Sequence, residues 1–251
     1  KRSPRWASIS PDGQTVVFAR RLNLYWMDKA NYEKALINED DSTIVEHQLT
    51  TDGVEHYAYG DSFNETNVDR EKNKSKRKPA FIYWAPSSKR FVLVRSDNRH
   101  VKDLWVINSI ADPRPTLETY KYHMPGEKEA PIAHVLLFDL GTKKQKELDI
   151  KQFKDQAIGI WSAPPLQSSR DDDYRSLVWL GTNDKLYFNR TSRDLKRIDV
   201  CQVDVNTESV KPLINEQMNT YVETRRLGLV NGGSELIHWS ERDGWAPLYL
   251  F

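Results

Sequence analysis

The sequence of 251 residues lacks the features that several common protein classes require. It has one cysteine, Cys201, which excludes an intrachain disulfide. No apolar run reaches the length of a membrane span or of a secretory signal segment. The 37 Lys and Arg residues and the 36 Asp and Glu residues leave a net charge of +1, without the basic excess that nucleic acids or membrane surfaces attract. We therefore expect no nucleic-acid partner and no membrane span in this chain.

The sequence also lacks the motifs of common enzyme sites. The pentapeptide G-x-S-x-G, which forms the nucleophile turn of α/β-hydrolases, does not occur. Asp171, Asp172 and Asp173 lack the spaced oxygen ligands and the glycine of a calcium loop. No two histidines have the spacing of metal ligands; the six are His47, His56, His100, His123, His134 and His238. We therefore predict no catalytic residue, no metal and no cofactor in this chain.

What the sequence does contain is a repeat. The stretch S-P-D-G-Q-T-V-V-F-A-R at residues 10–20 resembles A-P-S-S-K-R-F-V-L-V-R at residues 85–95. Shorter versions occupy residues 181–190 and 231–240. Each copy has turn-forming residues followed by a run of β-prone residues, which is the pattern of a β-hairpin. The high aromatic content, 11% of residues, suits short and half-buried strands.

A second repeat completes the unit. Residues 138–148, F-D-L-G-T-K-K-Q-K-E-L, match residues 203–213, V-D-V-N-T-E-S-V-K-P-L, and both read as strand, polar turn and strand. The two repeats together make a meander of four strands, which is one blade of a β-propeller. We therefore predict an all-β fold, a partial β-propeller of about four blades. The predicted blades are residues 6–52, 80–150, 157–215 and an incomplete last blade at 221–251.

Insertions explain the uneven spacing of these repeats. Residues 29–45 are polar and could include a short helix at 32–37. Residues 61–78 are highly charged, and we interpret them as a loop insertion. Its basic run K-N-K-S-K-R-K at 72–78 is flanked by Asp69 and Glu71 and has no interleaved aromatics, so we expect a solvated loop. Residues 113–131 are expected to separate two strands of the second blade.

Four phrases carry a resemblance to a known family. The phrase S-E-R-D-G-W-A-P-L-Y stands at residues 240–249, S-P-D-G at 10–13, L-T-T-D-G at 49–53 and Y-K-Y-H-M-P-G-E at 120–127. In this order they resemble the N-terminal β-propeller domain of the dipeptidyl peptidase IV type, in the prolyl oligopeptidase family of serine peptidases. The resemblance covers nearly the whole chain and is closest to bacterial members.

The resemblance implies a role for the chain. In that family an eight-bladed propeller caps a C-terminal α/β-hydrolase domain that carries the Ser-Asp-His triad. It implies that this chain is a non-catalytic cap that gates peptide substrates and docks on a hydrolase domain missing from the chain. It also implies a periplasmic or otherwise extracytoplasmic protein. A homodimer of the full-length protein is an expectation of the same kind.

One departure concerns the substrate site. Members of the family place an acidic D-W-x-Y-E-E-E motif after the segment equivalent to residues 49–60, and its glutamates bind the substrate's amino terminus. Residues 61–78 stand there instead, with Glu65 and Glu71 isolated and with no Asp-Trp before them. The two glutamates are therefore weak candidates for substrate binding. Dipeptidase specificity does not follow from the resemblance.

A second function stays open at this stage. The blade repeat alone equally suits a stand-alone propeller that binds a protein or a glycan and has no peptidase activity. Only the family phrases favour the peptidase cap. The chain also ends in a strand-like run, P-L-Y-L-F, and we expect further blades and a catalytic domain to follow it.

Overall fold

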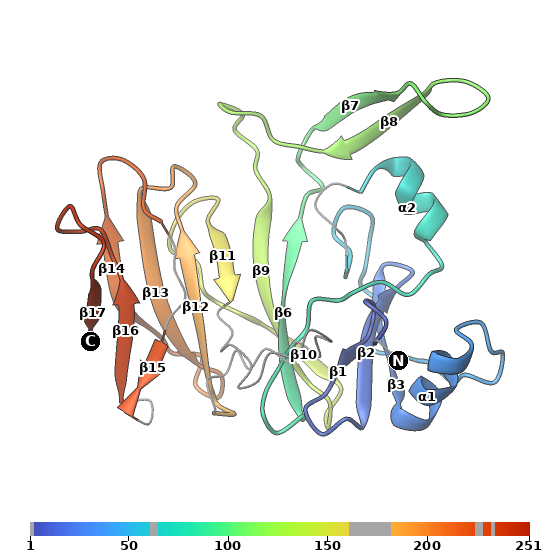
Figure 1. The fold of residues 1–251 in the computed structure, drawn as a ribbon, viewed down its shortest axis with the longest axis horizontal. Helices are drawn as coiled ribbons and strands as arrows, with labels where there is room; N and C mark the ends of the chain where they lie inside the picture. Colours follow the sequence, from blue (N-terminus) through green and yellow to red (C-terminus); the bar gives the residue numbers. More distant parts are fainter. Residues whose placement is uncertain (1–2, 61–64, 161–181, 224–227, 232–233) are drawn as a thin grey trace. The chain divides into compact units, whose positions relative to one another are not determined.

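The computed structural model describes residues 3–60, 65–160, 182–223, 228–231 and 234–251 (Figure 1). The chain divides into two compact units. The first unit comprises Lys1–Ile82 and Arg95–His134, and the second comprises Tyr83–Val94 and Val135–Phe251.

The first sheet belongs to the first unit and has the order β1-β2-β3-β4. Its strands are β1 (Ser8–Ile9), β2 (Thr15–Arg20), β3 (Asn23–Asp28) and β4 (His47–Gln48), all antiparallel. The turn S-P-D-G closes between β1 and β2 because Asp12 Oδ1 accepts hydrogen bonds from Ser10 Oγ and from the amide of Gln14. Gly13 supplies the positive φ, +71°, that this turn needs.

A short helix, α1 (Lys29–Ile37), follows β3. Asp28 caps its N-terminus by accepting a hydrogen bond from the amide of Asn31. Tyr32 and Ala35 are buried in the same apolar cluster as Trp6 and Phe18, which is the core of the first sheet. The helix expected at residues 32–37 is confirmed, and it begins three residues earlier because of the Asp28 cap.

A second helix, α2 (Asn67–Asn73), corrects the expectation of a loop at residues 61–78. Thr66 caps it, because its side chain accepts a hydrogen bond from the amide of Asp69. None of the helix residues is buried, so the helix has no apolar stripe. The missing stripe is why the sequence pattern did not predict a helix here.

The second sheet has the order β10-β9-β6-β5. Its strands are β5 (Tyr83–Trp84), β6 (Arg90–Asp97), β9 (Ile132–Asp139) and β10 (Lys144–Leu148). Between β6 and β9 the chain forms a separate antiparallel pair, β7 (Asp103–Asn108) and β8 (Thr116–Lys121). The insertion in this sheet is therefore residues 98–131, longer than the expected 113–131. Trp105, Ile107 and Leu117 of the pair are exposed.

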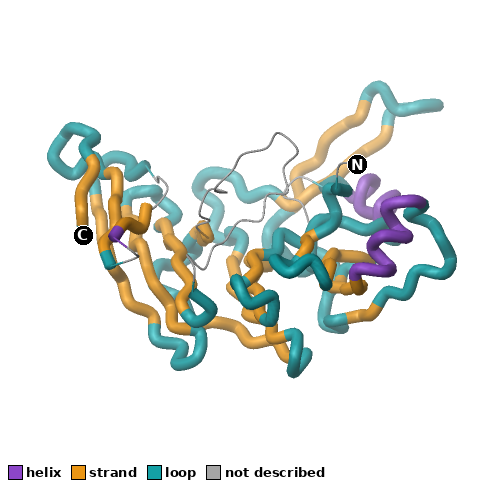
Figure 2. Tube along the Cα trace, turned by 60° about the horizontal axis from the view of Figure 1, so that its bottom comes forward, coloured by secondary structure: helices purple, strands orange, loops and turns teal. Residues whose placement is uncertain are grey.

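The third and fourth sheets belong to the second unit. The third has the order β11-β12-β13-β14, with strands Ala157–Ile160, Lys185–Thr191, Arg197–Asp204 and Val210–Gln217. The fourth has β15 (Gly228–Val230), β16 (Glu235–Trp239) and β17 (Leu248–Leu250). Strands predominate over helices along the described chain (Figure 2). The acidic run Asp171 to Asp173 lies outside the described residues.

An apolar cluster forms the main core of the second unit. It joins side chains of the second sheet, such as Val92 and Leu137, to Phe188 and Val203 of the third sheet. Cys201 is buried in this cluster, and burial raises the pKa of its thiol to about 11. The thiol is therefore a small apolar group of the core, as its place in an alternating strand predicts.

These sheets confirm the predicted fold class, an all-β partial β-propeller built of antiparallel four-stranded sheets. The last sheet has three strands in the described part of the chain, as the incomplete repeat predicts. The assignment of residues 6–52, 80–150, 157–215 and 221–251 to individual blades stays a prediction.

Candidate functional site

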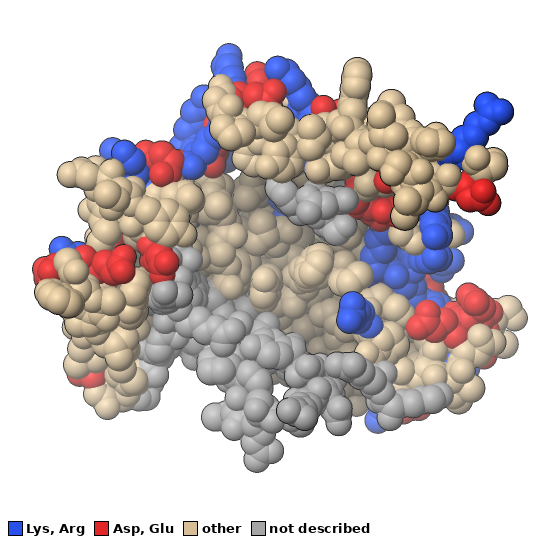
Figure 3. Space-filling view, turned by 45° about the horizontal axis from the view of Figure 1, so that its top comes forward, with Lys and Arg blue, Asp and Glu red and all other residues tan. Residues whose placement is uncertain are grey.

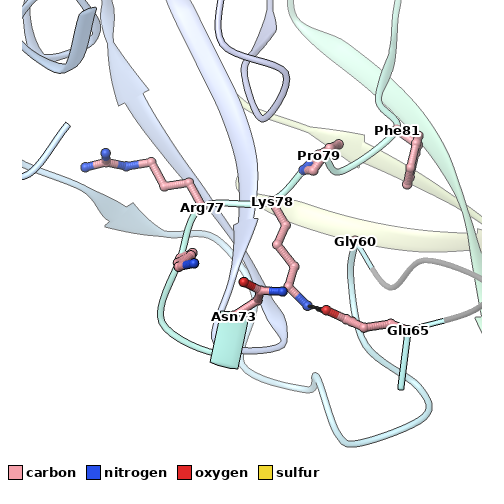
Figure 4. Close-up of a pocket in the computed structure, with 8 residues that line it drawn as sticks. Gly60, Glu65, Asn73, Arg77, Lys78, Pro79 and Phe81 are labelled. Atoms are coloured by element: carbon pink, nitrogen blue, oxygen red, sulfur yellow. Dashed lines mark hydrogen bonds and ion pairs between the residues drawn. The ribbon is translucent and has the colours of Figure 1, made fainter. Parts of the chain in front are cut away.

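A cavity of about 240 Å³ lies in the first unit (Figure 4). It is bounded by the segment that ends at Gly60, by Glu65, and by the chain that leaves α2. The lining residues are Gly60, Glu65, Asn73, Lys76, Arg77, Lys78, Pro79 and Phe81. Most of them lie in residues 61–78, the charged segment that stands where related sequences have the acidic D-W-x-Y-E-E-E motif.

Backbone hydrogen bonds fix the wall of the cavity that follows α2. The amide of Lys78 donates to the carbonyl of Ala19 at 2.8 Å, and the amide of Ala19 donates to the carbonyl of Lys78 at 2.9 Å. The amide of Arg21 donates to Lys74 O at 3.1 Å. Residues 74–78 are thus held along the end of β2, because paired backbone groups replace the side-chain packing that this polar segment lacks.

Gly60 forms the opposite wall and allows a close backbone approach. Its φ is +75°, a conformation that side chains other than glycine's rarely adopt. A Cβ atom at this position would lie 2.4 Å from Ala19 Cβ and 2.6 Å from Pro79 O. The glycine is therefore required for the chain to pass beside β2 at this point.

Glu65 and Lys78 form the central ion pair of the cavity. Lys78 Nζ lies 2.6 Å from Glu65 Oε1 and 2.7 Å from Oε2, so it donates to both carboxylate oxygens. Glu65 is 9% exposed as a residue, and the Lys78 side chain is 19% exposed. The two side chains point toward each other in Figure 4. The pair neutralises a buried carboxylate that would otherwise be strongly disfavoured.

Arg77 belongs to a different charge cluster. Its Nε donates to Glu46 Oε1 at 2.7 Å, and Arg20 Nη1 donates to the other oxygen of the same carboxylate at 2.5 Å. The Arg77 guanidinium also lies 5.2 Å from the centre of the Trp6 ring. In Figure 4 its side chain points away from those of Lys78 and Glu65. Arg77 therefore anchors the cavity wall to the core of the first sheet.

The two predicted site glutamates are not brought together. Glu65 lines the cavity, whereas Glu71 is on the exposed helix α2. The Oε2 atom of Glu71 lies 3.4 Å from Lys74 Nζ. Whether either one binds a substrate stays a prediction. The expectation of a solvated basic run at 72–78 is wrong for Arg77 and Lys78, whose side chains are 11% and 19% exposed. No local pattern separates Arg77 and Lys78 from the exposed Lys74 and Lys76, because their burial depends on contacts with distant segments.

A second polar centre of the first unit surrounds Arg95. Arg95 Nη1 donates to Asp52 Oδ2 at 2.6 Å, and its Nη2 donates to Tyr57 O at 2.6 Å. The guanidinium lies 3.5 Å from the centre of the Tyr57 ring and 4.2 Å from that of Tyr59. The side chain of Arg95 is 1% exposed. The sequence pattern shows Arg95 only as the last residue of a repeat. It does not predict that Arg95 pairs with Asp52 of the L-T-T-D-G phrase.

The repeat position of Arg95 recurs with the same chemistry. Arg20 pairs with Glu46 in the first sheet, and Arg190 pairs with Asp199 at 2.7 Å in the third. Each arginine stands near the end of the strand that follows the repeated turn. An ion pair at the end of this strand is therefore a structural element of the repeat, and we assign these arginines a structural role.

The C-terminal phrase S-E-R-D-G-W-A-P-L-Y forms a compact turn in the second unit. Arg242 donates to Glu216 Oε1 at 2.6 Å, and its guanidinium lies 4.6 Å from the centre of the Tyr249 ring. The hydroxyl of Tyr249 donates to Asp243 Oδ2. Gly244, with φ at +81°, completes the turn. This phrase therefore joins β14, β16 and β17 by charge and aromatic contacts.

His238 lies beneath this turn. It is 1% exposed, and its Nε2 lies 3.3 Å from Glu216 Oε1. Burial lowers the pKa of His238, although the nearby Glu216 carboxylate acts in the opposite direction. A neutral histidine buried under an arginine and a carboxylate is a structural group.

Outside these centres, charged side chains and the residue types that bind metals are dispersed in the described part of the chain. On the face drawn in Figure 3, basic and acidic side chains are interspersed. Within the described ranges, no three His, Cys, Asp or Glu side chains are grouped to hold a metal ion. None of the described helices is both long and apolar enough to cross a membrane.

Comparisons with known proteins identify the fold and the family. A family model described as the dipeptidyl peptidase IV (DPP IV) N-terminal region matches residues 2–251. Among curated proteins, no sequence matches the chain. A solved structure of dipeptidyl peptidase 4 from Porphyromonas gingivalis matches with a TM-score of 0.69 and 21% identity, over 98% of this chain and 30% of that one.

A second solved structure agrees. A putative dipeptidyl aminopeptidase IV from Bacteroides ovatus matches with a TM-score of 0.65 and 19% identity. The match covers 99% of this chain and 30% of that one. At these identities the two structures show the fold. The chain thus spans about 30% of the length of each solved structure.

Proposed function

Because the chain belongs to the family of dipeptidyl peptidase IV N-terminal regions, we propose that it is the non-catalytic propeller cap of a serine peptidase. The observation that carries this proposal is the family match, which extends over residues 2–251. The fold match to two bacterial peptidase structures, over 98% and 99% of this chain, supports it. The remaining length of such proteins has room for a catalytic domain.

The proposed role has two parts. The cap gates peptide substrates by size, and it docks on a C-terminal α/β-hydrolase domain of the same polypeptide. A Ser-His-Asp triad requires a nucleophile, a base and an oxyanion hole in one rigid constellation. The sequence of this chain has no G-x-S-x-G nucleophile turn, so we assign the triad to the hydrolase domain. The proposed partners are therefore the hydrolase domain and peptides.

Location and assembly belong to the same proposal. We place the whole protein in the periplasm or another extracytoplasmic compartment, as the resemblance to bacterial members of the family implies. Cell fractionation tests this placement. A homodimer of the full-length protein stays a prediction, and its mass in solution tests it.

A length series of substrates tests the gating role. The full-length protein is given short peptides and unfolded polypeptides that contain the same cleavable sequence. The proposal predicts efficient cleavage of the short peptides and a steep decrease in kcat/KM with increasing length. Protein inactivated beforehand by a fluorophosphonate serves as the control for contaminating peptidases. Cleavage that does not depend on length contradicts gating, and no cleavage of any peptide contradicts the peptidase proposal.

A further inference from the structure

One carboxylate oxygen of the second unit faces two basic side chains. Glu216 Oε1, near the end of β14, accepts a hydrogen bond from Arg242 Nη2 at 2.6 Å. The same oxygen lies 3.3 Å from His238 Nε2. The side chain of Glu216 is 4% exposed, so its charge needs a partner inside the protein. Glu216 therefore has one neighbour that is always charged, the arginine, and one that is charged only when protonated, the histidine.

His238 makes no hydrogen bond in this arrangement. Neither ring nitrogen has a hydrogen-bond partner among the described residues, although the residue is only 1% exposed. A buried N–H group without a partner costs free energy. Protonation makes both ring nitrogens donors, and Glu216 Oε1 is close enough to Nε2 to accept a charge-assisted hydrogen bond. The neutral ring is therefore poorly satisfied, whereas the protonated ring has an acceptor in place.

Few charged groups act on His238. Glu216 favours its protonation and Arg242 opposes it. On β17, Tyr249 stands opposite His238 in the strand register, and the centre of the Phe251 ring lies 6.3 Å from that of the imidazole. Burial has the largest effect and lowers the pKa of His238, so the ring takes up a proton below its usual value of about 6.5.

Protonation of His238 gives the buried carboxylate two cations. Glu216, Arg242 and His238 then hold one excess positive charge, which is unfavourable in a poorly solvated place. The two cations differ in their access to water, because His238 is 1% exposed and the Arg242 side chain is 35% exposed. The arginine can regain solvent by turning outward, and the histidine cannot. Arg242 is therefore the group that leaves.

Arg242 also holds its own turn together. Its amide and its Nε donate to Ser240 Oγ at 3.2 and 3.1 Å. Its guanidinium lies 4.6 Å from the centre of the Tyr249 ring and 5.2 Å from that of Phe251. The hydroxyl of Tyr249 donates in turn to Asp243. When Arg242 leaves the carboxylate of β14, the turn loses the side chain that ties it to that strand.

We propose that residues 240–247 form a latch that is operated by pH. At neutral pH Arg242 is bound to Glu216 and the turn is closed. When His238 takes up a proton from solvent, its imidazolium replaces Arg242 on Glu216, the guanidinium turns into solvent, and the turn opens. Loss of the proton closes the turn again. The latch needs no ligand, and it does not depend on the peptidase proposal.

Hydrogen exchange of the full-length protein, followed by mass spectrometry, tests the latch. Amide exchange is measured at about pH 7.5 and about pH 5, with each rate corrected for the intrinsic effect of pH on exchange. Peptides that cover residues 240–250 should lose protection several-fold at the lower pH, whereas peptides from β12 and β13 of the same unit should keep theirs. Equal losses in both regions, or no loss at residues 240–250, overturn the proposal.

Three substitutions identify the groups involved. His238→Gln should keep residues 240–250 protected at the lower pH. The matched control is His47→Gln, which changes an exposed histidine of the first sheet and should respond as wild type does. Glu216→Gln should open the turn at both pH values, because Arg242 loses its carboxylate. A His238→Gln protein that still opens at the lower pH overturns the proposal, as does a Glu216→Gln protein whose turn stays closed.

A measurement on wild type alone decides the question if these variants do not fold. Deuterium exchange at the imidazole C2 carbon depends on protonation of the ring, and mass spectrometry of the peptide that contains His238 gives its midpoint. The opening of residues 240–250 should have the same midpoint. Midpoints that differ by about one pH unit or more overturn the proposal, because another group then controls the turn.

Discussion

Arg95 Nη1 lies 2.6 Å from Asp52 Oδ2, and this bond joins the strand β6 to the L-T-T-D-G segment within the first unit. The Asp52 carboxylate also accepts a hydrogen bond from the hydroxyl of Tyr59 at 3.0 Å. The pKa of Asp52 is lowered, because its hydrogen bonds to Arg95 and Tyr59 outweigh the opposing effect of burial. A buried guanidinium thus organises the segment that leads to the cavity.

Replacement of Arg95 by lysine should destabilise the protein. Lysine lacks the planar fork that reaches both Asp52 and the carbonyl of Tyr57, so its ammonium group cannot replace both hydrogen bonds in the same geometry. We expect a loss of about 2–4 kcal/mol in the free energy of unfolding, measured by denaturant titration. Arg99→Lys is the matched control. Arg99 also lies over the Tyr57 ring, but its side chain is 54% exposed, so its loss should be small. Equal losses for both variants would contradict this account.

The ion pair of Arg190 and Asp199 should behave similarly in the second unit. Both side chains are below 10% exposure, at 5% and 8%, and Asp199 Oδ1 also accepts from Asn215 at 2.7 Å. Asp199→Ala leaves a buried guanidinium without its carboxylate, and we expect a loss of about 3–5 kcal/mol. Lys146→Ala removes an exposed pair with Glu208 and should change stability by about 0.5 kcal/mol or less. Thermal unfolding of both variants checks the contrast.

Acid should destabilise the protein through the buried His238 and the half-buried His56. Burial lowers the pKa of His238 and of His56, so both are neutral in the folded state where they would be protonated in an unfolded chain. Stability should be fully present above about pH 6.5, the unfolded value, and should be lost as the pH falls through the folded pKa of each group.

Two substitutions separate these contributions. His238→Gln and His56→Asn should each flatten part of the decrease in unfolding free energy below pH 6.5, and the double variant should flatten both. Denaturant titrations at a series of pH values provide the measurement. An unchanged slope in the double variant would show that other groups govern acid stability.

Gly60 should tolerate no side chain. Gly60→Ala forces a Cβ to within 2.4 Å of Ala19 Cβ and adopts an unfavourable φ, so we expect a loss of about 2 kcal/mol or more. Gly126→Ala is the matched control, because Gly126 has φ at +85° but nothing within 4 Å of an added Cβ. Its loss should be about 1 kcal/mol. The difference in Tm between the two variants measures the contact itself.

The fold could be predicted well where the repeat was intact. The turn and strand at residues 10–20 follow directly from S-P-D-G and the apolar run after it, because Asp12 and Gly13 fix that turn locally. The separate pair of β7 and β8 could not be predicted in the same way. Its strands alternate like those of any hairpin, and only the pairing of β9 beside β6 shows that they stand outside the second sheet.

The candidate site was harder to predict than the fold. Glu65 was identified by its position in the sequence, but its partner Lys78 lies 13 residues away. The two meet because Lys78 pairs by its backbone with Ala19, a contact between residues 59 positions apart that no local pattern encodes. Composition favoured a solvated loop at residues 72–78, and tertiary hydrogen bonds prevailed over that preference.

The location of the reactive serine tests the central claim most directly. The full-length protein is labelled with a fluorophosphonate, digested, and the modified residue is identified by mass spectrometry. If this chain is the non-catalytic cap of a serine peptidase, a single serine outside residues 1–251 should carry the label, and labelling should abolish peptide cleavage. A label on a serine within residues 1–251, or no labelled serine in a folded full-length protein, would contradict the account.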